Sequence, residues 1–384
     1  MLCTVEKKDT IDFIKKEKTF SKNSNDNTAD KENKECEEEK YKYLMSCKTQ
    51  ESLVKYLKQH CPEFIEKFEL SDYLKSGGFG SVVTAFPKIK NNSNKKKPKE
   101  IALKFLNLSG YSKEKKEIKH SEILIHGLLK HKNIPTIFGY YKIKENSCIA
   151  MDYCQYGDLE NFKKKILKRN DISQTLLCYI LGGLCEAVHY IHYHHKIIHM
   201  DIKQQNVLVD DYLNIKLTDF SVSISYKNKN KISLPKVGTS YYMSPEVLNK
   251  KTILAENASK IDVYSIGVLL YRLAFNDYPY KLREVETKNH AKIAKYIEEN
   301  ELEFPEDDLI SNPFLNLLRH CLDKDITKRY NIFQLMKDPW YQGYNIILRE
   351  KENLYNAGTF LIDLMMDNFW EFNEYVKNID KNEI

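Results

Sequence analysis

The segment from His199 to Asn206, followed thirteen residues later by Asp219, constrains this chain more than any other part of its sequence. It brings a carboxylate, a lysine and an amide close together along the chain and adds a second carboxylate. Phosphoryl transfer needs a carboxylate to orient the incoming hydroxyl, a cation beside the migrating phosphate, and two oxygen-bearing side chains to hold Mg²⁺. The residues that match these roles, in this order, are Asp201, Lys203, Asn206 and Asp219.

In these segments the chain resembles the eukaryotic protein kinase family, whose H-R-D-x-K-x-x-N and D-F-G motifs match except at Met200 and Ser221. The resemblance implies an α+β, two-lobed fold, with a small antiparallel β-sheet lobe plus one helix and a larger, mainly α-helical lobe. It implies that Asp201 orients the substrate hydroxyl and accepts its proton, and that Lys203 balances charge on the γ-phosphate. Asn206 and Asp219 are then the expected Mg²⁺ ligands.

The run from Leu74 to Val82 resembles the glycine-rich loop of the family, whose backbone N–H groups close over phosphate oxygens. The resemblance assigns nucleotide contacts to Leu74, Gly77, Gly80 and Val82. Lys75 stands at the first of the three family glycines, which predicts a looser closure or partial replacement by the lysine charge. Taken alone, a glycine pair with an aromatic would indicate only a hairpin.

Lys104 resembles the strand lysine that holds the α- and β-phosphates of ATP, and a carboxylate must fix its ammonium. Glu122 is the best candidate, because it precedes His131 by nine residues, the interval that the family uses between its helix glutamate and the next turn. By itself Glu122 would be one of several surface acids. His126 is expected to be a packed, neutral core histidine against Phe220, with a pH-dependent shift of the helix as the alternative.

The segment Met151-Asp152-Tyr153-Cys154 resembles the family hinge, which presents backbone groups to adenine, with Met151 at the gatekeeper position. Asp158 aligns with the acid that contacts ribose. A flat heterocycle packs against small and apolar side chains. The residues assigned to this packing are Val82, Ala102 and Leu208, each of which would otherwise be read as plain core.

The segment from Gly238 to Glu246, together with Lys203 two residues after Asp201, favours the serine/threonine branch and a shelf for a peptide substrate. Thr239 is expected to hydrogen-bond the catalytic Asp and Lys. Supporting contacts are expected from Asp262 to the catalytic-loop backbone, and between Glu246 and Arg329 in a buried ion pair.

Two departures from the family pattern keep a second interpretation open. Met200 replaces the arginine that pairs with a phosphorylated activation-loop residue in many members, so activation by loop phosphorylation is not expected. Ser221 replaces a glycine and restricts the backbone. With Lys75, they motivate the alternative of a pseudokinase acting as a nucleotide-binding scaffold or allosteric partner. Small-molecule phosphotransfer is disfavoured by the peptide shelf.

A zinc site is the alternative reading of five histidines at 189, 192, 194, 195 and 199. It is disfavoured because no cysteine or carboxylate completes the set at close spacing.

Composition limits the function classes. The chain has 60 Lys+Arg against 54 Asp+Glu, and the resulting +6 is too small to indicate a nucleic-acid partner. Nine scattered cysteines indicate thiols in a reducing compartment. The longest apolar stretch, Tyr264 to Phe275, is too short to span a bilayer and contains Arg272. We therefore expect no transmembrane segment and an intracellular, cytoplasmic protein, a nuclear location remaining open. The family resemblance implies that it uses ATP and Mg²⁺ on Ser/Thr-containing protein substrates.

The pattern along the chain predicts four parts: a disordered leader (1–40), a helical extension (41–69), the catalytic domain (70–340) and a helical C-terminal extension (341–384). Strands are expected in a hairpin at 70–83 and at 101–105, 134–142 and 148–153. Helices are expected at 113–130, 173–192, 259–275, 313–322 and 332–336. The apolar cluster from Phe360 to Phe372 is expected to pack on the large lobe or on a partner helix.

Overall fold

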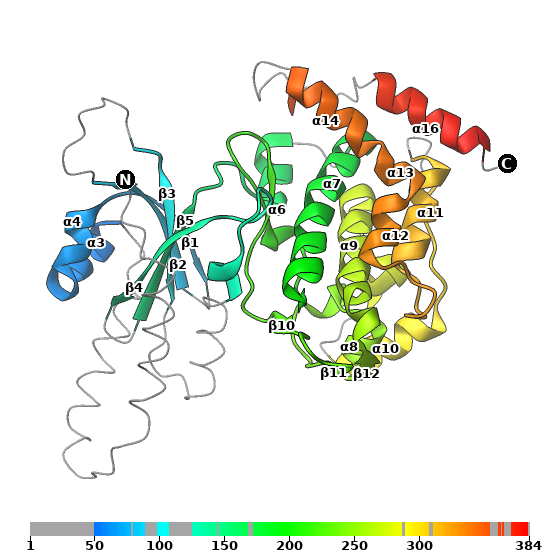
Figure 1. The fold of residues 1–384 in the computed structure, drawn as a ribbon, viewed down its shortest axis with the longest axis horizontal. Helices are drawn as coiled ribbons and strands as arrows, with labels where there is room; N and C mark the ends of the chain where they lie inside the picture. Colours follow the sequence, from blue (N-terminus) through cyan, green and yellow to red (C-terminus); the bar gives the residue numbers. More distant parts are fainter. Residues whose placement is uncertain are drawn as a thin grey trace, which may run out of the picture. The chain divides into compact units, whose positions relative to one another are not determined.

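The computed structural model describes residues 50–77, 80–88, 98–106, 125–143, 146–167, 172–285, 289–306, 310–353, 360–361, 363–364 and 370–382. These residues fall into two compact units, one formed by 50–106 with 136–153 and the other by 125–135 with the residues from 154 onward (Figure 1). The predicted leader and most of the helix predicted from 113 lie outside the described residues.

The first unit is a five-stranded antiparallel sheet with strand order β1-β2-β3-β5-β4. Its strands are β1 (Phe68–Gly77), β2 (Gly80–Pro87), β3 (Ile101–Leu106), β4 (Ile137–Ile143) and β5 (Asn146–Asp152). Gly77 pairs with Gly80, so only residues 78 and 79 connect β1 to β2. The predicted hairpin and the three further strands are confirmed, with boundaries shifted by at most four residues.

The two faces of this sheet carry different side chains, because successive residues of a strand point to opposite sides. One face is apolar and packs against helices α3 (Gln50–His60) and α4 (Pro62–Lys67). Leu103 and Phe105 of β3 meet Tyr56 and Phe64 of these helices in one buried cluster. Both helices lie within the segment predicted as a helical extension (41–69) (Figure 1).

The second unit is mainly helical. Its longer helices are α7 (Gln174–Tyr190), α9 (Ala258–Phe275), α10 (His290–Glu299), α11 (Asn312–Cys321), α14 (Tyr344–Asn353) and α16 (Trp370–Asn382). Its shorter helices are α6 (Leu159–Phe162), α8 (Pro245–Leu248), α12 (Ile332–Lys337) and α13 (Pro339–Gln342). The predicted helices at 173–192, 259–275, 313–322 and 332–336 are confirmed. Ser173 starts α7 as its N-cap, accepting a hydrogen bond from Leu176 N over 3.1 Å.

Short antiparallel strands connect the helices of this unit. They are β6 (Gly157–Asp158), β7 (Ile197–Ile198), β8 (Val207–Val209), β9 (Ile215–Leu217), β10 (Ile224–Ser225), β11 (Lys231–Ser233) and β12 (Thr252–Leu254). They form three small sheets, β6-β8-β9, β10-β7 and β11-β12. A π-helical turn, Ile191–His195, leads from α7 into β7.

The C-terminal residues pack on the helices of the second unit (Figure 1). The Phe372 ring lies 6.3 Å from the Trp340 ring, and the Phe360 ring lies 5.2 Å from that of Tyr179. The prediction that the tail's apolar cluster packs on this lobe is confirmed for its described residues. Among the described helices, none has both the length and the apolar composition required to cross a membrane.

Candidate active site

A buried carboxylate holds the backbone at the start of the loop from His199 to Asn206. Asp262 of α9 is fully buried and accepts hydrogen bonds from His199 N (2.8 Å), Met200 N (3.0 Å) and His192 Nε2 (2.7 Å). Burial raises the pKa of Asp262, but the hydrogen bond from His192 and the nearby His199 outweigh this and leave it lowered. The predicted contact between Asp262 and the loop backbone is confirmed.

This support fixes an unusual backbone conformation. Met200 has φ 71, in the left-handed region that residues other than glycine rarely adopt. Its side chain is 4% exposed. Such conformations persist only where neighbouring contacts enforce them, and here the two hydrogen bonds to Asp262 do so.

Asp201 lies at the centre of a polar network. Its Oδ2 is 2.7 Å from Lys203 Nζ, and its Oδ1 accepts a 2.7 Å hydrogen bond from Thr239 Oγ1. The Lys203 ammonium also donates to Thr239 Oγ1 over 2.8 Å. Asn206 Nδ2 donates to the carbonyl and to Oδ2 of Asp201, over 2.8 and 2.9 Å. The predicted contacts of Thr239 with Asp201 and Lys203 are confirmed.

His199 links this loop to the segment that begins at Thr218. Its Nε2 lies 3.0 Å from the Thr218 carbonyl and therefore carries the proton, which leaves Nδ1 to accept from Asp201 N at 3.3 Å. The His199 ring also contacts the ring of Phe220, with centroids 5.0 Å apart. His126 lies 5.1 Å from the same ring, is 3% exposed, and has its Nε2 2.9 Å from Pro135 O. The expectation of a packed His126 is confirmed.

Asn206 and Asp219 are brought together by pairing of β8 with β9. Thr218 N donates to Asn206 O over 2.9 Å, which places Asp219 one residue beyond a direct hydrogen bond to Asn206. Asp219 has φ 69. Aspartate is among the few residues that enter this left-handed region, and such positions cluster at active sites.

The candidate nucleotide residues of the sheet unit share one face. Val82 pairs with Lys104, Lys104 with Ile149, and Ala102 with Met151. Val82, Ala102 and Met151 belong to one apolar cluster on the side opposite α3 and α4. Leu74, Lys75, Gly77 and Gly80 lie in the β1–β2 hairpin, where only the backbone is described. Glu122, the predicted partner of Lys104, lies outside the described residues.

Two residues predicted to contact the nucleotide, Asp152 and Asp158, also accept hydrogen bonds from the protein backbone that the sequence did not indicate. Asp152 Oδ2 accepts from Thr136 N over 2.8 Å. Asp158 is 6% exposed and caps α6, accepting from Asn161 N over 2.8 Å. Cys154 is buried, and Leu208 is a half-buried residue of β8.

The segment 238–246, which the resemblance predicts to receive a peptide substrate and which is called here the substrate shelf, packs directly on the loop from His199 to Asn206. Gly238 has φ 110, and a Cβ there would collide with the Met200 carbonyl. Ser240 Oγ lies 2.9 Å from His290 Nε2 of α10, and Tyr241 donates to Val285 O over 2.8 Å. Sequence reasoning missed His290, which no local motif marks.

Comparison with known proteins agrees with this arrangement. The family described as "Protein kinase domain" matches residues 68–341. The chain belongs to the protein kinase family. The expected family and two-lobed fold class are thus confirmed, and the described kinase domain comprises an antiparallel sheet unit and a larger helical unit.

Several curated relatives are protein kinases. The chain is 30% identical over 288 residues to fatty acyl-CoA synthetase and RNA processing-associated kinase 1 of Saccharomyces cerevisiae, covering 73% of this chain and 32% of that protein. It is 27% identical over 340 residues to the cell cycle serine/threonine-protein kinase CDC5/MSD2 of the same yeast, covering 88% and 44%. Serine/threonine-protein kinase Aurora-2 of Arabidopsis thaliana is 26% identical over 276 residues, covering 71% and 89%. The chain thus spans less than half the length of the first two relatives.

The substrate shelf ends at a buried ion pair. Arg329 donates to Glu246 Oε1 over 2.6 Å and to Oε2 over 3.1 Å, and both residues are almost fully buried. The predicted pair is confirmed. The guanidinium lies 4.8 Å from the centre of the Tyr264 ring.

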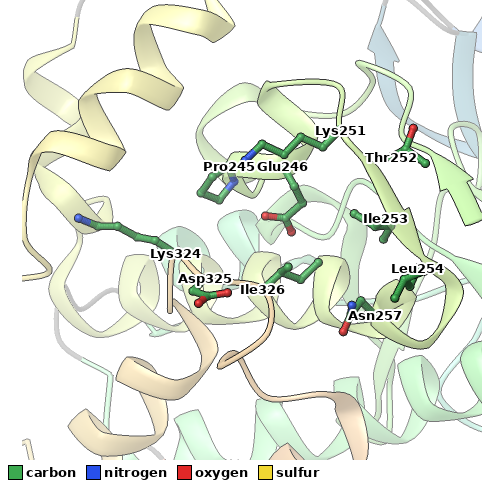
Figure 2. A pocket seen from close by; sticks show the side chains of 10 residues that line it. All are labelled: Pro245, Glu246, Lys251, Thr252, Ile253, Leu254, Asn257, Lys324, Asp325 and Ile326. Carbon is green, nitrogen blue, oxygen red and sulfur yellow. The ribbon is translucent and has the colours of Figure 1, made fainter.

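A cavity of about 430 Å³ opens beside this ion pair, between β12 and the loop at 324–326. Figure 2 shows the Glu246 carboxylate amid its lining, with Lys251 and Thr252 on one side and Lys324 and Asp325 on another. The Lys324 ammonium donates hydrogen bonds to the carbonyls of Glu298 and Asn300, so it is already paired within the protein.

The histidines of the zinc alternative serve other contacts. His192 binds Asp262, His199 binds the Thr218 carbonyl, and His189 stacks on Tyr193 with centroids 5.6 Å apart. In the part of the chain that the structure describes, no group of three or more His, Cys, Asp or Glu side chains is arranged to hold a metal ion.

Proposed function

We propose that this chain is an active, ATP- and Mg²⁺-dependent serine/threonine protein kinase whose catalytic domain comprises residues 70–340. The observation that carries the proposal is the network in which Lys203, Thr239 and Asn206 all contact Asp201. A scaffold that only bound nucleotide would need no such preorganised carboxylate beside a substrate shelf.

Asp201 is suited to orient a hydroxyl. A carboxylate offers about four lone-pair sites, and among the described residues Oδ1 accepts one side-chain hydrogen bond, from Thr239. The remaining capacity can accept the hydroxyl of a substrate Ser or Thr. During transfer, the acceptor oxygen forms a bond to the γ-phosphorus, the bond to the β-phosphate bridging oxygen breaks, and the proton passes to Asp201.

The donor set fits a magnesium ion. The Asn206 amide nitrogen donates two hydrogen bonds to Asp201, which turns the amide oxygen away from that residue. Asp219 follows the residue bonded to the Asn206 backbone. Amide and carboxylate oxygens are the hard ligands that Mg²⁺ prefers. Bound Mg²⁺ would neutralise phosphate charge, while Lys203 supplies a cation beside Asp201.

Residues 220–245, called here the activation segment, are held by strand pairing instead of by a phosphate group bound to an arginine. Met200 is buried and uncharged where an arginine would bind a phosphate. The pairing of β11 with β12 and the buried pair Ile232 and Ile253 anchor the segment. We infer that activity does not require phosphorylation of this segment.

Two substitutions test the function. Lys104→Met should remove the cation that holds the α- and β-phosphates, and Asp201→Asn should remove the proton acceptor. Each should abolish incorporation of labelled phosphate from ATP into a Ser/Thr protein substrate, while circular dichroism shows folded protein.

The same experiment separates the kinase from a pseudokinase. Wild-type protein should show both a thermal shift with Mg²⁺ and ATP and phosphate transfer. A thermal shift with no transfer to a pool of peptides would contradict the kinase and support the scaffold.

The finer assignments follow from the kinase proposal. The residues that bind the nucleotide would be those of the β1–β2 hairpin, Lys104 with Glu122, and the hinge at 151–154. The kinase itself would act in cytoplasmic signalling. A partner at the C-terminal tail would have to bind outside Phe360, Leu364 and Phe372, since these three are buried.

A further inference from the structure

The activation segment carries an uncompensated basic surface. Residues 220–245 contain four lysines and no Asp or Glu, and two more lysines follow Glu246. All six are exposed, and no ion pair joins any of them to an acid among the described residues. The set, called here the basic surface, is Lys227, Lys229, Lys231, Lys236, Lys250 and Lys251.

Strand pairing fixes how part of this surface is displayed. In the β11–β12 pair, Ile232 and Ile253 are buried, so their neighbours point outward. Lys231 is therefore exposed on the outer face of β11. Leu234 N donates to Lys251 O over 3.2 Å, which places Lys251 beside the end of β11.

The basic surface continues to the substrate shelf. Lys236 lies two residues before Gly238, where the shelf begins, and its positive charge adds to burial in lowering the pKa of His290. His290 in turn contacts Ser240 of the shelf. A peptide lying on the shelf would therefore meet positive charge within a few residues of its acceptor hydroxyl.

Two carboxylates at the shelf and the adjoining loop do not offset this charge. Glu246 is buried and bound to Arg329, and Asp201 is bound to Lys203. Uncompensated charge of one sign attracts ligands of the opposite sign and selects among them. No aromatic side chain is exposed between residues 220 and 254, so stacking on nucleic-acid bases is not available there.

We propose that the kinase selects acceptor sites flanked by anionic side chains, either Asp/Glu or phosphorylated residues, and that the basic surface reads them. This rests on the proposed function, because it assigns a substrate class to the same shelf. The recognition is electrostatic and should weaken with added salt.

The test compares four peptides with the same acceptor serine and with flanks that are neutral, Asp-rich, phosphoserine-containing or Lys-rich. We expect kcat/KM for the Asp-rich or the phosphoserine peptide to exceed that for the Lys-rich peptide by roughly tenfold or more. The two anionic peptides show which source of charge is preferred. Fluorescence anisotropy with the same labelled peptides measures binding independently of turnover.

A triple variant should lower the ratio of kcat/KM between anionic and neutral peptides to one or below. It carries Lys231→Glu, Lys236→Glu and Lys251→Glu. The matched control, Lys58→Glu, Lys295→Glu, Lys377→Glu, makes the same change of charge at exposed lysines elsewhere and should keep the ratio.

The possible failures are distinguishable. Equal phosphorylation and equal binding of all four peptides would overturn the acid selectivity and leave the kinase intact. No transfer to any peptide would count against the kinase, and anisotropy would then decide the selectivity alone. Loss of duplex nucleic-acid binding in the variant, with unchanged peptide ratios, would assign the surface to a different partner and overturn the proposal.

Discussion

At the scale of single residues, the site depends on short polar contacts that act in pairs. Thr239 joins Asp201 to Lys203 through one hydroxyl that donates to the carboxylate and accepts from the ammonium. A hydroxyl can serve both roles because it has one donor and two lone pairs. The orientation of the Asp201 carboxylate is therefore determined by a residue 38 positions away in the sequence.

Thr239→Val should lower kcat by roughly ten- to hundredfold, because losing the hydrogen bonds to Asp201 and Lys203 should raise the barrier by about 1.4–2.7 kcal/mol. Steady-state kinetics with a peptide substrate measures this, and the KM for ATP should change little. Thr239→Ser keeps the hydroxyl and should retain most of the activity. Equal kcat values for the valine variant and the wild type would show that Thr239 does not position Asp201.

Tyr264 presents a second prediction at this scale. Its hydroxyl is buried and has no hydrogen-bond partner among the described residues. An unsatisfied buried polar group costs about 1–3 kcal/mol, so Tyr264→Phe should raise the free energy of unfolding by about 1 kcal/mol. Urea denaturation measures the change.

Tyr280→Phe is the matched control, since the Tyr280 hydroxyl is also buried but donates to Leu322 O over 2.6 Å. Losing that bond should destabilise the protein. If both variants lose stability equally, the Tyr264 hydroxyl has a partner.

At the scale of elements, the pairing of β11 with β12 is the feature that holds the activation segment. Three residue pairs form the ladder, and Ala255 N adds a hydrogen bond to Asn230 O over 2.9 Å. Because β12 follows α8 directly, this pairing ties the segment to the end of the substrate shelf.

Ile253→Asn should release this segment, because Ile253 is 7% exposed and a buried amide without a partner costs about 1–3 kcal/mol. Trypsin should then cut faster at Lys227 to Lys236, and kcat should fall. Leu254→Asn, at the neighbouring position that is 47% exposed, should change neither. Identical cleavage rates in the two variants would contradict a restraining role for the pairing.

At the scale of the whole molecule, segments outside the catalytic motifs complete each unit. In the sheet unit, α3 and α4 cover the face that carries Leu103 and Phe105. In the helical unit, Lys351 of α14 donates to Tyr179 (2.6 Å) and Asn214 (2.9 Å), which joins the C-terminal extension to α7 and β9.

Lys351 should make stability depend on pH. Burial lowers its pKa to about 8, with Asp210 partly opposing this, whereas the unfolded chain has a lysine pKa of about 10.4. Between these values the unfolded state holds a proton that the folded state lacks, so this contribution to stability rises with pH. The Tm of the wild type relative to Lys351→Met should therefore increase from pH 7.5 to 9.5.

Differential scanning fluorimetry at several pH values measures the effect. Lys377→Met removes an exposed lysine from α16 and is the control for loss of one charge. A wild-type Tm that falls relative to Lys351→Met as the pH rises would contradict the buried environment of this ammonium.

The sequence by itself determined the family, the fold class and most strands and helices, because short motifs and apolar periodicity are local properties of the chain. It also indicated the contacts of Thr239, Asp262 and the Glu246–Arg329 pair through the family resemblance. The catalytic and nucleotide roles remain predictions, and Glu122 lies outside the described residues.

Only the tertiary structure decided the contacts between distant segments that no motif marks. His192 supports Asp262 across 70 residues, and β12 pairs with an activation segment about 20 residues before it. The exposed lysines became one surface only when the strand register showed which residues point outward. Such contacts depend on chain packing and on the alternation of strand faces, and neither is encoded in any single stretch of sequence.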